Sequence, residues 1–199
     1  MKVVIATTNQ GKFKQYQELF KELNNKVEFV SLNDINYTKE VIENADTFEG
    51  NSLLKATQVF NDTGLTTIAD DSGLCVDALN GAPGVYTARY AGKNATKLQS
   101  LNLLLGNMIN VKDENRTAHF VCVITCLLPN KIKIVSRGEC NGHIAKEISN
   151  INEGITYDPI FIPNGYNKTL SAFTQDERVK INHRGIAARK FITEFKKLL

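Results

Sequence analysis

Two adjacent carboxylates, Asp70 and Asp71, follow the short apolar run of residues 66–69 and precede Ser72 and Gly73. A buried strand that ends in this way would deliver both acids to the rim of a cleft. Neighbouring anions are costly to desolvate unless a cation or a substrate proton uses them, and a divalent metal is the natural partner for carboxylate oxygen. The alternative is a solvated turn, because Asp-Asp-Ser-Gly is also good turn composition.

A second chemical feature is the polar segment of residues 7–12, which separates an apolar run at residues 2–6 from a helical pattern of apolar residues. A loop between a strand and a helix presents backbone N–H groups to an anion, and the hydroxyl, amide and lysine groups of this loop add further donors. It is not a Walker A loop, because the first glycine is missing and Phe13 stands where a Ser or Thr would bind metal. Polar loops of this kind are common, so the segment alone indicates phosphate binding only weakly.

Two further clusters of polar residues carry hydrogen-bond donors that could bind a phosphate or a carbonyl oxygen. Asn51 and Lys55 lie four residues apart in a helix predicted to begin near Thr47, so they share one face, which is either a phosphate site or simply solvated. Near the C-terminus, His183 and Arg184 follow a good helix N-cap residue, which places them at the positive end of the last helix. Donors there suit a carbonyl oxygen or a phosphate, and the alternative is an ordinary basic flank of the helix.

The elements that must position these residues alternate between strand and helix patterns. Strands are predicted at residues 2–6, 27–32, 66–69, 118–128 and 131–140, and helices at residues 13–23, 47–61, 97–108 and 186–198. The last two strands are predicted to form a hairpin at Pro129-Asn130, whereas the other strands are separated by helices. This combination favours a mixed sheet with flanking helices. The 199 residues suffice for one domain, with or without two lobes.

Composition excludes several classes of protein. A net charge of +3 is too small to indicate binding to nucleic acid or membranes, no apolar stretch has the length of a membrane span, and the N-terminus lacks the layout of a signal peptide. Cys122 and Cys126 are four residues apart in a predicted strand, about 13 Å, which is beyond disulfide reach. Together with Cys75 and Cys140 they are expected to be reduced thiols of a cytoplasmic protein.

Five blocks, in this order, resemble the inosine/xanthosine triphosphate pyrophosphatases, which hydrolyse non-standard purine nucleoside triphosphates. The blocks are the Thr-x-Asn-x-x-Lys loop, Glu43 with Thr47-Phe48, Asn51 and Lys55-Ala56, the Ala69-Asp-Asp-Ser-Gly-Leu segment with its Gly-Ala-Pro-Gly-Val-Tyr tail, Tyr157-Asp158-Pro159-Ile160-Phe161, and His183-Arg184. The resemblance covers residues 2–190. It implies an α/β fold in which an elongated, curved mixed β-sheet with flanking helices forms two lobes around a central nucleotide-binding cleft, all in a single domain of residues 1–199.

The resemblance also implies an activity: ITP, dITP and XTP are hydrolysed to the monophosphate and pyrophosphate, which cleanses the nucleotide pool. Asp71 would accept a proton from the attacking water with help from Asp70, and Glu43 and Asp71 would bind Mg²⁺. The residues implied to contact the triphosphate substrate are Thr7, Thr8, Asn9, Gln10, Gly11, Lys12, Lys55, Ser72, Ile155, Thr156, Tyr157, Asp158, Arg178, Lys180, His183 and Arg184. Of these, His183 and Arg184 would bind the oxygen at purine position 6. The implied assembly is a homodimer, with neither nucleic acid nor membrane as a partner.

Several positions depart from the family pattern. They are Asn44-Ala45 in place of Thr-Gly, Gly50 in place of a glutamate, Ile155-Thr156 in place of Phe-Gly, Arg178 in place of a lysine, and Asn182 in place of a serine. Because Ile155 lacks an aromatic face, Tyr157 becomes the preferred ring for stacking on the purine. Two other functions stay open, a pyrophosphatase for modified pyrimidine nucleotides and a nucleotide sensor that has lost catalysis.

Overall fold

The structure is a computed structural model that describes residues 1–199. Its strands form a six-stranded sheet with the order β2-β1-β3-β4-β5-β6. The strands are β1 (Lys2–Ile5), β2 (Glu28–Ser31), β3 (Thr66–Val76), β4 (Thr117–Leu127), β5 (Lys133–Ile144) and β6 (Phe161–Pro163). Strand β1 pairs in parallel with both β2 and β3, whereas β5 and β6 are antiparallel, so the predicted mixed sheet is confirmed.

Five α-helices accompany the sheet. They are α1 (Gln10–Leu19), α2 (Phe48–Thr63), α3 (Lys97–Asn107), α4 (Gln175–Ile181) and α5 (His183–Phe195). None of the helices is long and apolar enough to cross a membrane. Helix α4 was absent from the sequence-based prediction although its capping box is visible in the sequence: Thr174 and Glu177 each accept from the other's backbone N–H.

The chain divides into two compact units. Unit 1 comprises Met1–Asp71, Cys122–Gly138 and Gly185–Leu199, and unit 2 comprises Ser72–Val121 and Glu139–Arg184. Strands β3, β4 and β5 contribute residues to both. The two units correspond to the two lobes that the resemblance implied.

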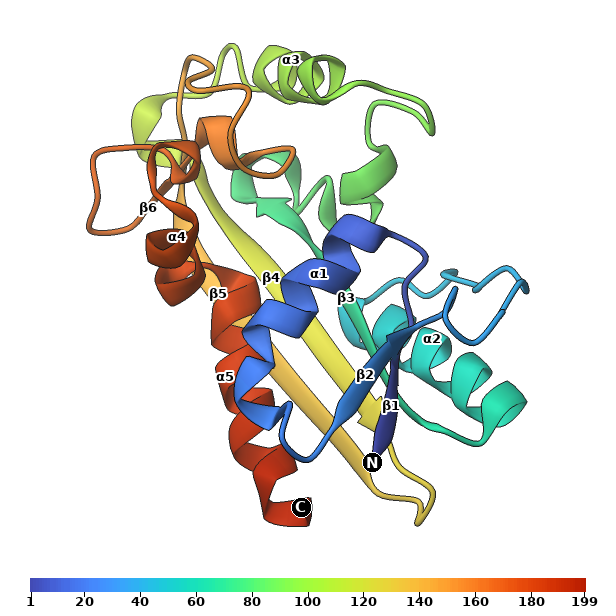
Figure 1. Cartoon of the computed structure of the whole chain (residues 1–199). Coiled ribbons are helices and arrows are strands. Elements are labelled where there is room, and N and C mark those ends of the chain that lie inside the picture. The colour runs from blue at the N-terminus through green and yellow to red at the C-terminus, as the bar shows by residue number, and fades with distance from the viewer. The chain divides into compact units, whose positions relative to one another are not determined.

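The core of unit 1 follows from the alternation of side chains along its strands. On β1, Val3 and Ile5 pack with residues of α1 and α5, whereas Val4 packs on the opposite face with residues of α2. On β3, Ile68 belongs to the first cluster and Ala69 to the second. Figure 1 shows the same arrangement, with α1 and α5 on one face of these strands and α2 on the other.

Helix α2 begins and ends at residues that satisfy its terminal backbone groups. The Thr47 hydroxyl accepts from the Gly50 N–H at 3.0 Å, and Gly64 ends the helix with φ of 68°, a conformation that glycine adopts without strain. The helix thus starts where the sequence predicted. Asn51 and Lys55 consequently lie on its buried face, and the solvated alternative for this face is wrong.

Unit 2 has a core of its own. Leu101 and Leu104 of α3, and Met108 directly after it, are fully buried against apolar residues of β3, β4 and β5. The same cluster includes Tyr157 and Phe161, so the segment around β6 is anchored in this core. The predicted helix at residues 97–108 is therefore confirmed, and its apolar face packs as its spacing indicated.

The acid pair lies within a strand, which corrects the sequence-based picture. Strand β3 does not end at Ala69 but continues to Val76, so Asp70 and Asp71 are both interior residues of the strand and only 6% and 8% exposed. The strand continues because Leu74 and Val76 are buried in the core of unit 2. The solvated turn is therefore excluded, and the two carboxylates point to opposite faces of the sheet.

Candidate active site

Lys55 is the centre of a charged cluster in unit 1. Its Nζ lies 2.7 Å from Glu43 Oε1 and 3.7 Å from Asp71 Oδ1, and the residue is 5% exposed. Burial alone would lower the pKa of this ammonium, but the charges of Asp70, Asp71 and Glu43 together raise that pKa above its ordinary value. Lys55 is thus a buried cation that holds two carboxylates near one point.

Asp71 has a carboxylate in an environment that disfavours its charge. Burial raises the pKa of Asp71, while Lys55 and a hydrogen bond from Asn51 act in the opposite direction. That bond runs from Asn51 Nδ2 to Asp71 Oδ2 at 3.1 Å. A carboxylate with a raised pKa is suited to accept a proton during a reaction.

Asp70 pairs with a different lysine. Its Oδ1 lies 2.6 Å from Lys12 Nζ, on the face of the sheet that α1 covers. The cost of burying two neighbouring anions is therefore reduced by two lysines, one on each face. Asp70 and Asp71 cannot both ligate a single ion from these positions, because successive residues of a strand point in opposite directions.

The segment of residues 7–12 forms the predicted junction between β1 and α1. Asn9 is the N-cap of α1, and its Oδ1 accepts from the Lys12 N–H at 3.0 Å, while the Thr7 hydroxyl accepts from the Asn9 N–H at 3.2 Å. Residues 8–11 are exposed. The cap thus orients the first turn of α1 and leaves exposed residues at its positive end.

Unit 2 contains a buried ion pair. Asp158 is 2% exposed, its Oδ2 accepts from the Ile155 N–H at 2.9 Å, and Arg178 Nη1 lies 3.4 Å from the same oxygen. Burial raises the pKa of Asp158, against the effects of the Ile155 N–H, Arg178 and Arg184. Gly154 has φ of +70°, and a Cβ there would clash with Asp158 Oδ2. The turn at residues 154–158 is therefore closed tightly around this carboxylate.

Tyr157 does not have the position that stacking on a purine requires. It is 1% exposed and lies in the core cluster of unit 2, and burial raises the pKa of its hydroxyl to about 12. Its predicted role as a stacking ring is thus unsupported, because a ring enclosed by core residues presents no face to a ligand. Ile155 is 37% exposed and Thr156 is half-buried, so these neighbours are the accessible part of the segment.

His183 and Arg184 open α5, as the sequence predicted. His183 is 1% exposed and stacks on Phe120, with the ring centroids 4.7 Å apart and the planes 9° from parallel. Arg184 donates from Nη2 to the Ser72 hydroxyl at 3.0 Å. The structure therefore places Arg184 beside Ser72 within unit 2, and Lys180 is exposed on α4.

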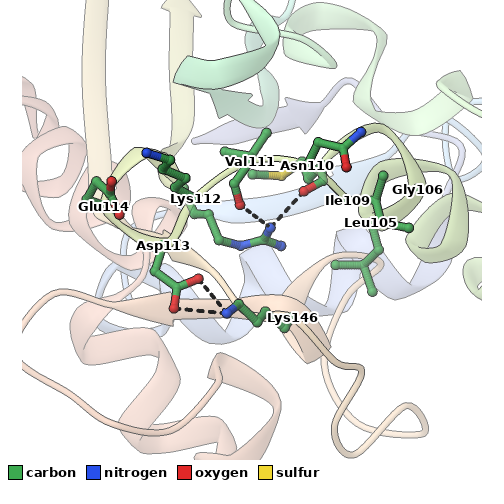
Figure 2. A pocket seen from close by; sticks show the side chains of 11 residues that line it. Leu105, Gly106, Ile109, Asn110, Val111, Lys112, Asp113, Glu114 and Lys146 are labelled. Carbon is green, nitrogen blue, oxygen red and sulfur yellow. Dashed lines mark hydrogen bonds and ion pairs between the residues drawn. The ribbon is translucent and has the colours of Figure 1, made fainter.

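Unit 2 also contains a pocket of about 690 Å³, shown in Figure 2, and none of the candidate residues lines it. The guanidinium of Arg116, which lines it, donates to the backbone carbonyls of Met108, Ile144 and Ala145. Figure 2 also shows the Lys146 ammonium at the carboxylate of Asp113. Arg116 and Lys146 thus have internal partners, which makes the pocket a poor match for a triphosphate.

Comparison with known proteins agrees with the family resemblance seen in the sequence. A family model described as the Ham1 family matches residues 3–194. This chain belongs to the Ham1 family. It is 39% identical over 204 residues to the dITP/XTP pyrophosphatase of Clostridium perfringens, which covers 100% of this chain and 98% of the relative. It is 40% identical over 190 residues to the dITP/XTP pyrophosphatase of Bacillus anthracis, which covers 94% and 93%.

Solved structures of Ham1 proteins have the same fold. The Staphylococcus aureus Ham1 protein superposes with a TM-score of 0.90 at 34% identity and covers 100% of both chains. A structure described as the nucleoside-triphosphatase, dITP/XTP pyrophosphatase, of Mycobacterium abscessus has a TM-score of 0.81 at 36% identity, and covers 96% of this chain and 97% of that one. The predicted α/β fold with a mixed sheet and flanking helices is thereby confirmed.

Gly50 and Ala45, two of the positions named in the sequence analysis as departures, lie close together. A Cβ built at Gly50 would lie 2.6 Å from the Cβ of Ala45 and 3.0 Å from the Thr47 hydroxyl. Ala45 cannot easily retreat, because its N–H donates to Asn51 Oδ1 at 2.9 Å. The methyl group of Ala45 thus fills the space that a side chain at position 50 would need.

We expect Gly50→Ala to lower the melting temperature, although alanine is normally favoured over glycine in a helix by about 1 kcal/mol. The overpacked methyl groups should cost about 1–3 kcal/mol. Adding Ala45→Gly should recover the loss. Gly106→Ala in α3 is the matched control, because a Cβ there meets nothing within 4 Å and should raise the melting temperature. If Gly50→Ala raised the melting temperature as much as Gly106→Ala does, the predicted overlap with the Ala45 methyl group would be contradicted.

Proposed function

We propose that this protein hydrolyses ITP, dITP and XTP to the nucleoside monophosphate and pyrophosphate with the help of Mg²⁺. The relatives named dITP/XTP pyrophosphatase support the substrate class. The observation that carries the proposal is the buried Lys55 ammonium held between the carboxylates of Glu43 and Asp71. Such a cluster combines a cation for phosphate, two metal ligands and a proton acceptor.

The carboxylates of Glu43 and Asp71 fit a Mg²⁺ ion that is also bound by phosphate oxygens of the substrate. No three His, Cys, Asp or Glu residues are grouped so that they could hold a metal by themselves. Mg²⁺ at nucleotide sites is usually bound by one or two carboxylates and by phosphate oxygens, which matches Glu43 and Asp71. The Lys55 ammonium marks a point where a cation already contacts both carboxylates. When bound, Mg²⁺ would neutralise phosphate charge and polarise the phosphorus centre.

The residues of unit 1 have separate tasks in the reaction. Water attacks the α-phosphorus, the bond from this phosphorus to the bridging oxygen breaks, and pyrophosphate leaves. Asp71 accepts the proton of the water, and its raised pKa suits it to this task. Lys55 and Lys12 neutralise the charge that develops on the leaving group, together with the first backbone N–H groups of α1.

The residues of unit 2 are assigned to the base. We assign the 6-oxygen of the purine to Arg184, with His183 beside it at the start of α5. Hypoxanthine and xanthine present an acceptor at this position, whereas adenine presents an amino group that would leave a buried donor unsatisfied. Asp158 and Arg178 support the base indirectly, because their ion pair closes the turn that carries the accessible residues Ile155 and Thr156.

The reaction is tested by product analysis on a panel of ITP, dITP, XTP, ATP, GTP and modified pyrimidine triphosphates. We expect one pyrophosphate for each monophosphate from the first three, with loss of activity in EDTA and recovery on addition of Mg²⁺. Orthophosphate as the primary product would contradict the assignment. A preference for pyrimidine nucleotides, or binding of ITP without any product, would favour one of the two alternative functions.

We further propose that the enzyme acts in the cytoplasm as a homodimer, without nucleic acid or membrane as a partner. Four free cysteines support a reducing compartment. Burial raises the pKa of Cys126 to about 12 and of Cys140 to about 11, so these thiols are unreactive. Light scattering on the purified chain tests the dimer, and a monomeric mass at micromolar concentration would contradict it.

A further inference from the structure

Asn51 is a fully buried amide with both ends of its side chain engaged. Its Oδ1 accepts from the Ala45 N–H at 2.9 Å, and its Nδ2 donates to Asp71 Oδ2 at 3.1 Å. The residue is 1% exposed. Because a backbone N–H can only donate, the Ala45 contact fixes which end of the amide is oxygen, and the nitrogen must then face the carboxylate.

We propose that Asn51 is a positioning residue that holds Asp71 in its reactive orientation; the inference rests on the function proposed above. The Asn51 donor occupies Asp71 Oδ2, while Oδ1 faces Lys55. Asn51 also anchors Ala45, two residues after Glu43, so one amide ties the segment that carries Glu43 to the strand that carries Asp71. Asn51 itself touches no reacting atom in this scheme.

The helix supports this role. Asn51 and Lys55 are one turn apart on α2, so a single rigid element presents an amide to Asp71 Oδ2 and an ammonium to Oδ1. The carboxylate is therefore held by its two oxygens from one helix. Misplacement of a catalytic group by about 1 Å can reduce a rate by about 100-fold.

Kinetics give the first test. We expect Asn51→Ala to lower kcat for ITP by about 10- to 100-fold with little change in KM, because the variant disturbs Asp71 and leaves the base-binding residues intact. Ser52→Ala is the matched control. The Ser52 hydroxyl is equally buried on the same turn but bonds to the Thr125 hydroxyl at 2.7 Å, so its loss should lower stability and leave kcat within about twofold of wild type. Equal kcat values for the two variants would overturn the inference.

A swap of the two side chains gives a second test without substrate or metal. Asn51→Asp retains the acceptor for the Ala45 N–H but places a second carboxylate against Asp71, so its melting temperature should fall. In the double variant Asn51→Asp/Asp71→Asn, an amide faces a carboxylate again, and the melting temperature should return toward that of wild type. Equal melting temperatures for Asn51→Asp and the double variant would show that the two residues do not pair.

The two tests separate the inference from the proposed function. If the wild-type protein releases no pyrophosphate from ITP, the proposed function fails, while the melting temperatures still support or overturn the pairing of Asn51 with Asp71. If the wild type is active and Asn51→Ala matches Ser52→Ala in kcat, the inference alone fails.

Discussion

Asp71→Asn should abolish turnover of ITP while the protein remains folded. The substitution keeps the shape of the side chain and can still accept the hydrogen bond from Asn51, but it removes the proton acceptor and one negative charge of the metal site. Loss of a general base alone typically costs about 10²- to 10⁴-fold in rate. Pyrophosphate release, measured at saturating Mg²⁺ and ITP, tests the prediction, and a rate within about tenfold of wild type would exclude Asp71 as the base.

The same substitution should not lower the melting temperature at neutral pH. Burial raises the pKa of Asp71 in the folded protein, so folding favours its protonated form. The contribution of Asp71 to stability is then present below its unfolded pKa of about 4 and is lost as the pH rises through the folded pKa. The melting temperature of Asp71→Asn relative to wild type should accordingly increase as the pH is raised above about 4.

The rate and the melting temperature of Asp71→Asn together distinguish a catalytic role of Asp71 from a structural one. An inactive variant with a lowered melting temperature would indicate that Asp71 serves mainly to pair with Lys55. An inactive variant with an unchanged or raised melting temperature would indicate that the charge of Asp71 serves the reaction and does not stabilise the fold.

Local signals in the sequence were sufficient for most elements. Thr47 predicts the start of α2, and the spacing of leucines predicts α3, because capping and helical periodicity are properties of a few neighbouring residues. The length of β3 was not predicted. Charged residues within a strand pattern indicate the end of the strand unless the groups that neutralise them are known. Asp70 and Asp71 are neutralised by Lys12 and Lys55, which lie on other elements of the chain.

The candidate site shows the same limit. The residue types that bind phosphate and metal were visible as blocks, but burial was not, so Tyr157 was predicted to stack on the purine although it lies in the core of unit 2. Asn51 was noticed only as a polar residue on the face of Lys55. Its partners, Ala45 and Asp71, become evident only when the loop before α2 and strand β3 are placed around it.

Arg184→Ala should narrow the preference of the enzyme for ITP over ATP. The guanidinium at the start of α5 donates to the Ser72 hydroxyl at 3.0 Å. Burial raises the pKa of the Asp158 carboxyl, and Arg184 lies near enough to oppose that rise in part. These contacts hold the side chain in one place, which a donor needs in order to distinguish an oxygen from an amino group. A hydrogen bond from a charged donor contributes about 1.5–3 kcal/mol.

That free energy corresponds to a loss of about 10- to 150-fold in the ratio of kcat/KM for ITP to kcat/KM for ATP. The ratio should fall because ITP loses its contact, whereas ATP, which presents an amino group there, loses none. Arg184→Lys should recover only part of the preference, since an ammonium retains the charge but not the planar arrangement of donors. Ser72→Ala should shift the ratio in the same direction by a smaller factor, because the guanidinium remains but is held less firmly. If Arg184→Ala lowers both kcat/KM values equally, Arg184 binds the phosphates that the two substrates share, and recognition of the 6-oxygen must lie with another donor.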